Sequence, residues 1–144
     1  MAQDSVTIVE TFWQEVWHQP QNPDAIDRLV HEDFIITSGG RDIVGREPFK
    51  AWVNDFQARV HDFEFHVIET FQNHDGNRVA SRWRVTGRNN GLMGTEPNGT
   101  PFEMVGTAVW EVVADGLLRH DWVDRNAYEV HGAITSKDAA PNLF

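Results

Sequence analysis

The sequence predicts an α+β fold, in which three N-terminal helices are followed by a curved antiparallel sheet. Hydrophobic residues recur at helical spacing up to about residue 60 and then alternate with a period of two. Asp-Gly pairs at residues 75–76 and 115–116 mark hairpin turns between the alternating segments. Helices that precede a run of long strands in this way are typical of segregated α+β proteins.

The three expected helices differ in how each one begins or ends. The first follows Ser5, a residue suited to N-capping, and ends before Pro20, because the residue preceding a proline disfavours helical geometry. The second is short and opens at residues 22–23, where a proline occupies the first turn. The third begins near residues 47–48 and has the clearest pattern. Its apolar residues have relative positions of 0, 3, 4, 7 and 11: Phe49, Trp52, Val53, Phe56 and Val60.

The other expected elements are strands, connected by one long loop and followed by a tail. A brief extended run at residues 34–37 precedes the third helix. The loop at residues 89–101 has no apolar period and is rich in Gly and Pro. We expect a single domain at residues 1–134 and a C-terminal tail at residues 135–144. The long strands are expected at residues 63–71, 78–88, 102–113 and 117–124.

The composition argues against several classes of function. The 144 residues include 12 basic and 22 acidic side chains, and the net charge of −10 repels nucleic-acid backbones. Cysteine is absent, which excludes thiolate metal sites, and no His or carboxylate spacing indicates another metal site. No apolar run approaches the ~20 residues of a membrane span and no signal peptide is evident, so we expect a cytoplasmic protein without a membrane partner. Six Trp and nine Phe against one Tyr can fill a core or line a pocket.

Four stretches of the chain carry a resemblance through their order and spacing. They are SGGRDIVGREPF at residues 38–49, VASRWRVTG at 79–87, GTEPNGTPF at 94–102 and DGLLRHDW at 115–122. Together with the helix pattern, they resemble the SnoaL-like polyketide cyclase branch of the nuclear transport factor 2-like superfamily. The resemblance implies a cone-shaped cup. Enzymes of this group use such a cup for acid/base chemistry without a metal or organic cofactor, and other members only bind ligands or partners.

The last expected strand holds the densest cluster of titratable groups. In the cyclases that the chain resembles, the acid/base group is an Asp on the last long strand, assisted by a His on a neighbouring strand. Here the candidates are Asp121, Asp124 and His120, although the strand at residues 102–113 contains no His. Because a strand alternates, one of the two carboxylates faces the cup, where burial raises a carboxyl pKa. The alternative is a strand end at the rim, with its charges in water.

The candidates for substrate binding are mostly aromatic. Their rings can line the cup, although their spacing is equally consistent with core packing. Arg82 can anchor a substrate carboxylate or enolate, or can pair with a carboxylate across the sheet. Asn89 can hydrogen-bond a ligand at the mouth of the cup, or can simply form a turn. The full set is Trp13, Trp17, Trp52, Phe56, Arg82, Trp83, Asn89, Trp110 and Trp122.

The leading hypothesis is a cofactor-independent lyase, isomerase or cyclase that acts on a small apolar carbonyl compound. We expect its pocket between the first helix, the third helix and the sheet, with a volume of at least ~300 Å³. One alternative is a non-catalytic binding domain with the same cup. Another is an epoxide hydrolase, which needs an Asp-Arg-Asp set that Asp121, Arg82 and Asp124 supply only loosely. We also expect a homodimer, because both faces of the strand at residues 102–113 carry apolar residues and the helices cover only one.

Overall fold

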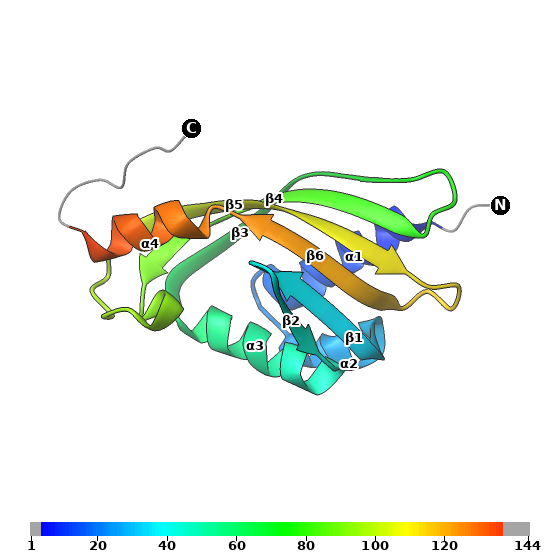
Figure 1. Ribbon diagram of the computed structural model, residues 1–144, viewed down its shortest axis with the longest axis horizontal. Helices are drawn as coiled ribbons and strands as arrows, with labels where there is room; N and C mark the ends of the chain where they lie inside the picture. Colours follow the sequence, from blue (N-terminus) through cyan, green and yellow to red (C-terminus); the bar gives the residue numbers. More distant parts are fainter. Residues whose placement is uncertain (1–3, 137–144) are drawn as a thin grey trace.

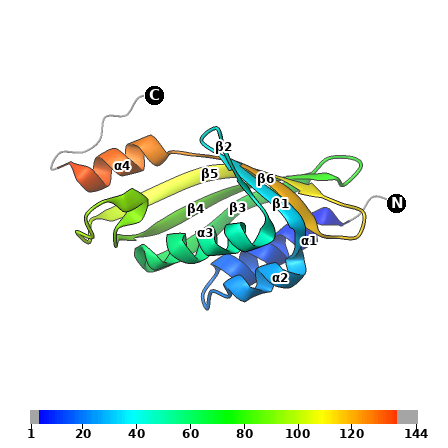
Figure 2. The same ribbon diagram turned by 60° about the horizontal axis from the view of Figure 1, so that its bottom comes forward.

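The computed structural model describes residues 4–136, which form one sheet with helices packed against it (Figure 1). Its elements are α1 (Ser5–Phe12), η1 (Trp13–Trp17), η2 (Pro23–Ala25), α2 (Ile26–Leu29), β1 (Val30–Ser38), β2 (Arg41–Val44), α3 (Arg46–Ala58), β3 (Val60–Gln72), β4 (Arg78–Asn89), η3 (Leu92–Gly94), β5 (Pro101–Val112), β6 (Leu118–Arg125) and α4 (Ala127–Thr135). The six strands follow the order β2-β1-β6-β5-β4-β3, and only β1 and β6 pair in parallel. Figure 2 shows α1, α2 and α3 on the same side of this sheet. The expected α+β class is thus confirmed.

The N-cap of the first helix lies one residue before Ser5, the expected cap. Asp4 is the N-cap, and its side chain accepts a hydrogen bond from the Thr7 N–H. Ser5 is buried in the first turn instead, where its hydroxyl donates to the Gly76 carbonyl of the β3–β4 hairpin. The helix then widens into the π-helical turn η1 and ends at Trp17. None of the helices within residues 4–136 is long and apolar enough to cross a membrane.

Aromatic rings fill most of the space between the helices and the sheet. Phe12 of α1 lies edge-on to Trp110 of β5, with ring centres 4.8 Å apart. Phe34 of β1 and Phe49 of α3 have centres 4.4 Å apart and connect the third helix to the sheet. None of these four side chains is more than 1% exposed. Burial on this scale stabilises the fold by about 1.5–3 kcal/mol for each phenylalanine.

The pairing of β1 with β6 departs from the expected all-antiparallel sheet. The apolar run at residues 34–37 indicated only part of β1, which extends over nine residues. Its register places Ile36 beside Asp121 of β6. The two strands are distant in the chain, so no hairpin turn fixes their relative direction and the parallel arrangement is accessible. β2 then extends the edge as a short antiparallel hairpin partner of β1.

The C-terminal helix α4 was not expected from the sequence. Asn126 precedes it, with its N–H 3.2 Å from the Val105 carbonyl and its side-chain oxygen 2.9 Å from the Val105 N–H. Val130 and Ile134 are its buried residues, and the helix packs on β5. The tail expected at residues 135–144 lies outside the described residues from 137 onward.

Gly106 of β5 gives the Trp83 ring room to lie across the sheet. Trp83 projects from the neighbouring strand β4, and the two residues are register partners. A Cβ atom at Gly106 would lie 2.4 Å from Cζ2 and 2.8 Å from Cε2 of Trp83, and 2.7 Å from the Asp124 carbonyl oxygen. Atoms cannot approach that closely, so only glycine is compatible with this ring position.

We predict that Gly106→Ala displaces the Trp83 ring and lowers the free energy of unfolding by about 1–3 kcal/mol, because the added methyl group overpacks the site. Urea unfolding measures the stability, and near-ultraviolet circular dichroism reports the ring environment. Trp83→Phe in the alanine background removes the clashing ring atoms and restores part of the loss; the Asp124 carbonyl limits the recovery. An alanine variant with the wild-type spectrum and stability would contradict this account of Gly106.

Candidate functional site

A cavity lies between the helices and the covered face of the sheet. The centre of a water molecule can occupy about 40 Å³ of this cavity. The total empty space between the lining atoms, including the open mouth, is about 450 Å³. Another hollow, in which water can be centred over about 460 Å³, lies beside Gln19 and residues 60–64, but it is polar and open to solvent. Five of the aromatic candidates line the inner cavity: Trp13, Trp17, Trp52, Phe56 and Trp83.

The cavity is smaller than the ~300 Å³ expected for a ligand site, because its rings interlock. Trp17 lies edge-on to Phe56 with ring centres 5.6 Å apart. Trp13 lies 4.8 Å from Phe65, and Phe65 lies 6.3 Å from Trp83. A volume of this size holds a few water molecules, and a larger occupant requires these rings to move. Trp110, another candidate, is fully buried in the adjacent core and does not line the cavity.

Asp121 is the carboxylate that faces this cavity. It is 3% exposed, and its Oδ1 atom has no hydrogen-bond partner among the described residues. Burial away from water raises the pKa of Asp121 well above its usual value. The group therefore favours the neutral acid form, which can donate a hydrogen bond as well as accept one. Of the two carboxylates proposed from strand alternation, Asp121 is the one on the cup side.

The indole N–H groups around the cavity divide into satisfied and unsatisfied donors. Trp13 donates through Nε1 to the Ser81 hydroxyl at 2.8 Å, and Ser81 in turn lies 2.9 Å from the Thr70 hydroxyl. The Nε1 atoms of Trp83 and Trp110 are buried without a partner among the described residues. Two residues that line the cavity therefore have a buried polar atom without a partner among the described residues: the Nε1 donor of Trp83 and the Oδ1 acceptor of Asp121.

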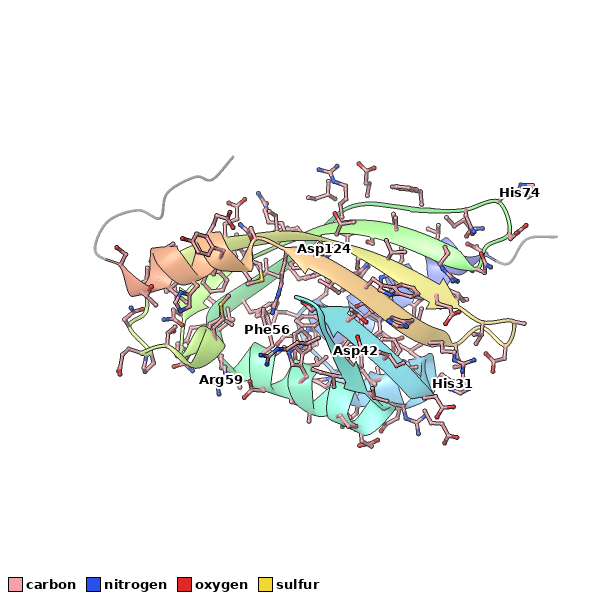
Figure 3. The ribbon with its side chains drawn as sticks, viewed as in Figure 1. His31, Asp42, Phe56, Arg59, His74 and Asp124 are labelled. Atoms are coloured by element: carbon pink, nitrogen blue, oxygen red, sulfur yellow. The ribbon has the colours of Figure 1, made fainter. Side chains whose placement is uncertain are left out.

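The other two catalytic candidates lie on the opposite face of β6. His120 stacks on Trp122 with ring centres 3.8 Å apart, and its Nε2 atom lies 2.8 Å from the hydroxyl of Thr37. That hydroxyl donates to Asp42 at 2.6 Å, so it accepts from His120. Partial burial lowers the pKa of His120. Asp124 is exposed on the outside of the sheet, as Figure 3 shows.

Arg82 and Asn89 also have partners away from the cavity. Arg82 projects from the outer face of β4 and forms an ion pair of 2.9 Å with Glu69. The structure therefore does not assemble the Asp-Arg-Asp set of an epoxide hydrolase from Asp121, Arg82 and Asp124.

Asn89 is fully buried at the base of the loop that follows β4. Its Nδ2 donates to the Glu96 carbonyl at 2.8 Å and to Asn98 Oδ1 at 3.0 Å. Its Oδ1 accepts from the N–H groups of Gly91 and Leu92 at 3.0 and 2.8 Å. These bonds occupy both ends of the amide, so the side chain holds the loop and is not free for a ligand.

Sequence reasoning missed Arg125, which also lines the cavity. Strand alternation was the available signal, because Asp121, Val123 and Arg125 are spaced by two residues and share one face of β6. The remaining lining residues are apolar, and no pattern in the sequence distinguished them from residues of the core. They are Phe12, Ile36, Phe49, Phe65, Val85 and Val123. Within residues 4–136, no three His, Asp or Glu side chains gather in a way that could hold a metal ion.

The fold is the nuclear transport factor 2-like, ketosteroid isomerase-like α+β fold. The chain belongs to the SnoaL-like domain family, whose model matches residues 9–120. The family expected from the four sequence stretches is thereby confirmed. No curated protein is similar enough in sequence to match.

Solved structures of the same fold have low sequence identity to this chain. A protein from Jannaschia Sp. CCS1, assigned as a SnoaL-like polyketide cyclase, has a TM-score of 0.83 at 20% identity, covering 93% of both chains. TsrD from Streptomyces laurentii has a TM-score of 0.77 at 18% identity, covering 94% of this chain and 98% of its own. A ketosteroid isomerase-like protein from Catenulispora acidiphila DSM 44928, solved with trimethylamine, has a TM-score of 0.69 at 18% identity, covering 92% and 93%. Such identities show a common fold and no more.

We predict that Asp121→Asn stabilises the protein at neutral pH. In the unfolded chain an Asp titrates near pH ~3.9, whereas burial raises the pKa of Asp121 in the folded state. Between these two values the folded state binds more protons, so the stability of the wild type falls as pH rises. Asn carries no such penalty, and the advantage of the variant should grow from pH ~4 upward and vanish below it.

Urea unfolding at several pH values tests this prediction. Asp124→Asn, on the exposed face of the same strand, controls for the change in net charge. A stability difference between wild type and Asp121→Asn that is independent of pH would show that Asp121 is not buried as a neutral acid.

Proposed function

We propose that this protein is a cofactor-independent acid/base enzyme, of the lyase, isomerase or cyclase type, that acts on a small apolar carbonyl compound. The observation that carries the proposal is Asp121, a buried carboxyl with an unpaired oxygen in a cavity walled by aromatic rings. Such a group is costly to the fold, because desolvation is not offset by a hydrogen bond. Strongly perturbed carboxyls inside a cleft are typical of proton-transfer sites.

The chemistry follows from the protonation state of Asp121. As a carboxylate, Asp121 accepts the α-proton of the ketone, and the electron pair of the broken C–H bond moves to the enolate oxygen. Asp121 then holds this proton as the neutral acid that burial favours, and returning the proton to another carbon of the enolate regenerates the carboxylate. The Nε1–H of Trp83, which has no partner among the described residues, is the donor that we propose for the enolate oxygen. The apolar walls exclude water, which strengthens these interactions.

A non-catalytic binding module is the second candidate, favoured by a different observation. Among the residues that line the inner cavity, Asp121 is the only one that is a carboxylic acid or a histidine, so a second acid/base group is missing from the wall. The tight cavity also suits a small ligand held by ring contacts. The relative from Catenulispora acidiphila was solved with trimethylamine, which supports the use of this fold for small molecules.

We predict that Asp121→Asn lowers kcat/KM by about 10²-fold or more, because the variant cannot transfer a proton. Suitable test substrates are β,γ-unsaturated cyclic ketones, whose isomerisation is followed through the absorbance of the conjugated product, and β-hydroxy ketones, whose dehydration gives an enone. The change should fall on kcat, with a smaller effect on the dissociation constant of the ketone.

Asp124→Asn is the matched control, because it makes the same chemical change on the outer face of β6. Turnover that survives in Asp121→Asn would remove the acid/base role. Ketones that bind to the wild type and to Asp121→Asn without any turnover would favour the binding module.

We infer that a second copy of the chain covers the outer face of the sheet. A line of cross-strand neighbours crosses this face from β3 to β6: Phe71, Ala80, Val109 and Trp122. Phe71 is 54% exposed and Val105, on the same face of β5, is 39% exposed. A continuous apolar strip on an otherwise charged face is typical of a surface that a partner buries.

We predict that light scattering at micromolar concentration gives about twice the 16.5 kDa of one chain. Phe71→Glu should shift the mass to that of the monomer, because a charge at the β3 end of the strip must be desolvated on association. Val44→Glu is the control, since Val44 is also exposed but lies on β2. A monomeric wild type would rule out the dimer.

A further inference from the structure

A second cavity adjoins the first, and Arg125 forms part of the wall of both. This outer chamber offers about 190 Å³ in which water can be centred, against about 40 Å³ in the inner cavity. The two share Trp52, Phe56 and Arg125 as lining residues. The opposite wall of the outer chamber is the segment η3 in the loop after β4. Arg125 thus stands where the apolar cup opens toward solvent.

Among the described residues, the guanidinium of Arg125 has ring faces and a sulfur atom as neighbours and no carboxylate. It lies 5.7 Å from the ring centre of Trp52 and 5.8 Å from that of Phe56. Its Nη1 atom is 3.8 Å from the sulfur of Met104, which is a weak acceptor. Within residues 4–136, Arg125 forms no ion pair with a carboxylate. Burial lowers the pKa of this guanidinium, which is consistent with a poorly solvated cation.

The other charges of the outer chamber neutralise each other. Arg59 donates through Nε to Asp55 at 2.9 Å and through Nη1 to the Gly91 carbonyl at 2.6 Å. Figure 3 shows Arg59 and Phe56 together at the end of α3. Asp55 is therefore committed to Arg59, and the chamber retains the unmatched positive charge of Arg125. In a chain of net charge −10, this local excess of positive charge is unusual.

We propose that Arg125 binds the carboxylate of the substrate in the outer chamber, while the carbonyl end of the same molecule lies beside Asp121 in the inner cavity. This proposal rests on the proposed function and specifies its substrate class as apolar, elongated keto acids. Asp121 and Arg125 lie four residues apart on one face of β6, which separates their Cα atoms by roughly 13 Å. A guanidinium forms two parallel hydrogen bonds with a carboxylate, which the rings and the sulfur around Arg125 cannot supply.

The competing explanation is that Arg125 is purely structural and holds α3 to the sheet through its contacts with the two rings. The two explanations predict opposite results in the absence of ligand. If Arg125 is structural, its replacement lowers the melting temperature of the protein. If Arg125 instead serves to bind a ligand, its buried charge destabilises the ligand-free protein, and a neutral replacement leaves the melting temperature unchanged or raises it.

Binding of one matched pair of probes tests the proposal: 6-oxo-6-phenylhexanoate and its methyl ester, measured by calorimetry and by quenching of tryptophan fluorescence. We expect the wild type to bind the acid about tenfold or more tightly than the ester, because a charge-assisted pair replaces water at Arg125. Arg125→Gln should abolish this preference and leave the affinity for the ester unchanged. Arg88→Gln is the matched control, because Arg88 is exposed and pairs with Asp62 on the outer face.

Every outcome of this experiment decides between the explanations. Equal affinity of the wild type for acid and ester, or a preference for the acid that persists in Arg125→Gln, overturns the role of Arg125 and leaves the proposed function standing. A lower melting temperature of ligand-free Arg125→Gln, with the preference unchanged, assigns Arg125 to the structural clamp. Failure of both probes to bind the wild type overturns the ketone-binding cup itself, and the carboxylate proposal with it.

Discussion

A carboxyl group held away from water without a hydrogen-bond partner is costly, and in this protein the cost falls on Asp121 at the centre of the cup. The rings of both layers create that environment, since they close the space between the helices and the sheet. The same rings supply much of the apolar burial that stabilises the fold. The stability of the fold and the proposed chemistry therefore depend on the same side chains, and a change in ring packing alters both.

Two neighbouring features of the sheet determine the surroundings of the Asp121 carboxyl. β6 places Asp121 and Arg125 on one face, with the apolar Val123 between them. Gly106 on the adjacent strand lets the Trp83 ring lie across the sheet as part of the cavity wall. Among the described residues that line the cup, Asp121 and Arg125 are the two with ionisable side chains, the first deep in the cup and the second at its mouth. Such an interior suits a molecule that is apolar in the middle and polar at its ends.

Much of the fold could be predicted from the sequence, because local periodicity determines which residues become helix or strand. The third helix and the four long strands were expected for that reason, and alternation alone required Asp121 and Asp124 to face opposite sides. The parallel pairing of β1 with β6 could not be predicted, since strand pairing between distant segments leaves no local signal in the sequence. The position of Arg125 on the cup side could have been predicted from the same alternation. The cavity volume was not, because it depends on the orientations of interlocking rings such as Trp17 and Phe65.

The loop after β4 has a consequence for how the specificity of this fold can change. Asn89 holds the loop from below through hydrogen bonds to backbone and side-chain groups, so the shape of the loop does not depend on the residues at its surface. Met93, which lines the outer chamber, is one of those surface residues. Substitutions there can remodel the entrance while the anchor and the buried acid stay in place. For the proposed enzyme, selectivity and reactivity are in this sense separable, because the entrance can change while Asp121 keeps its surroundings.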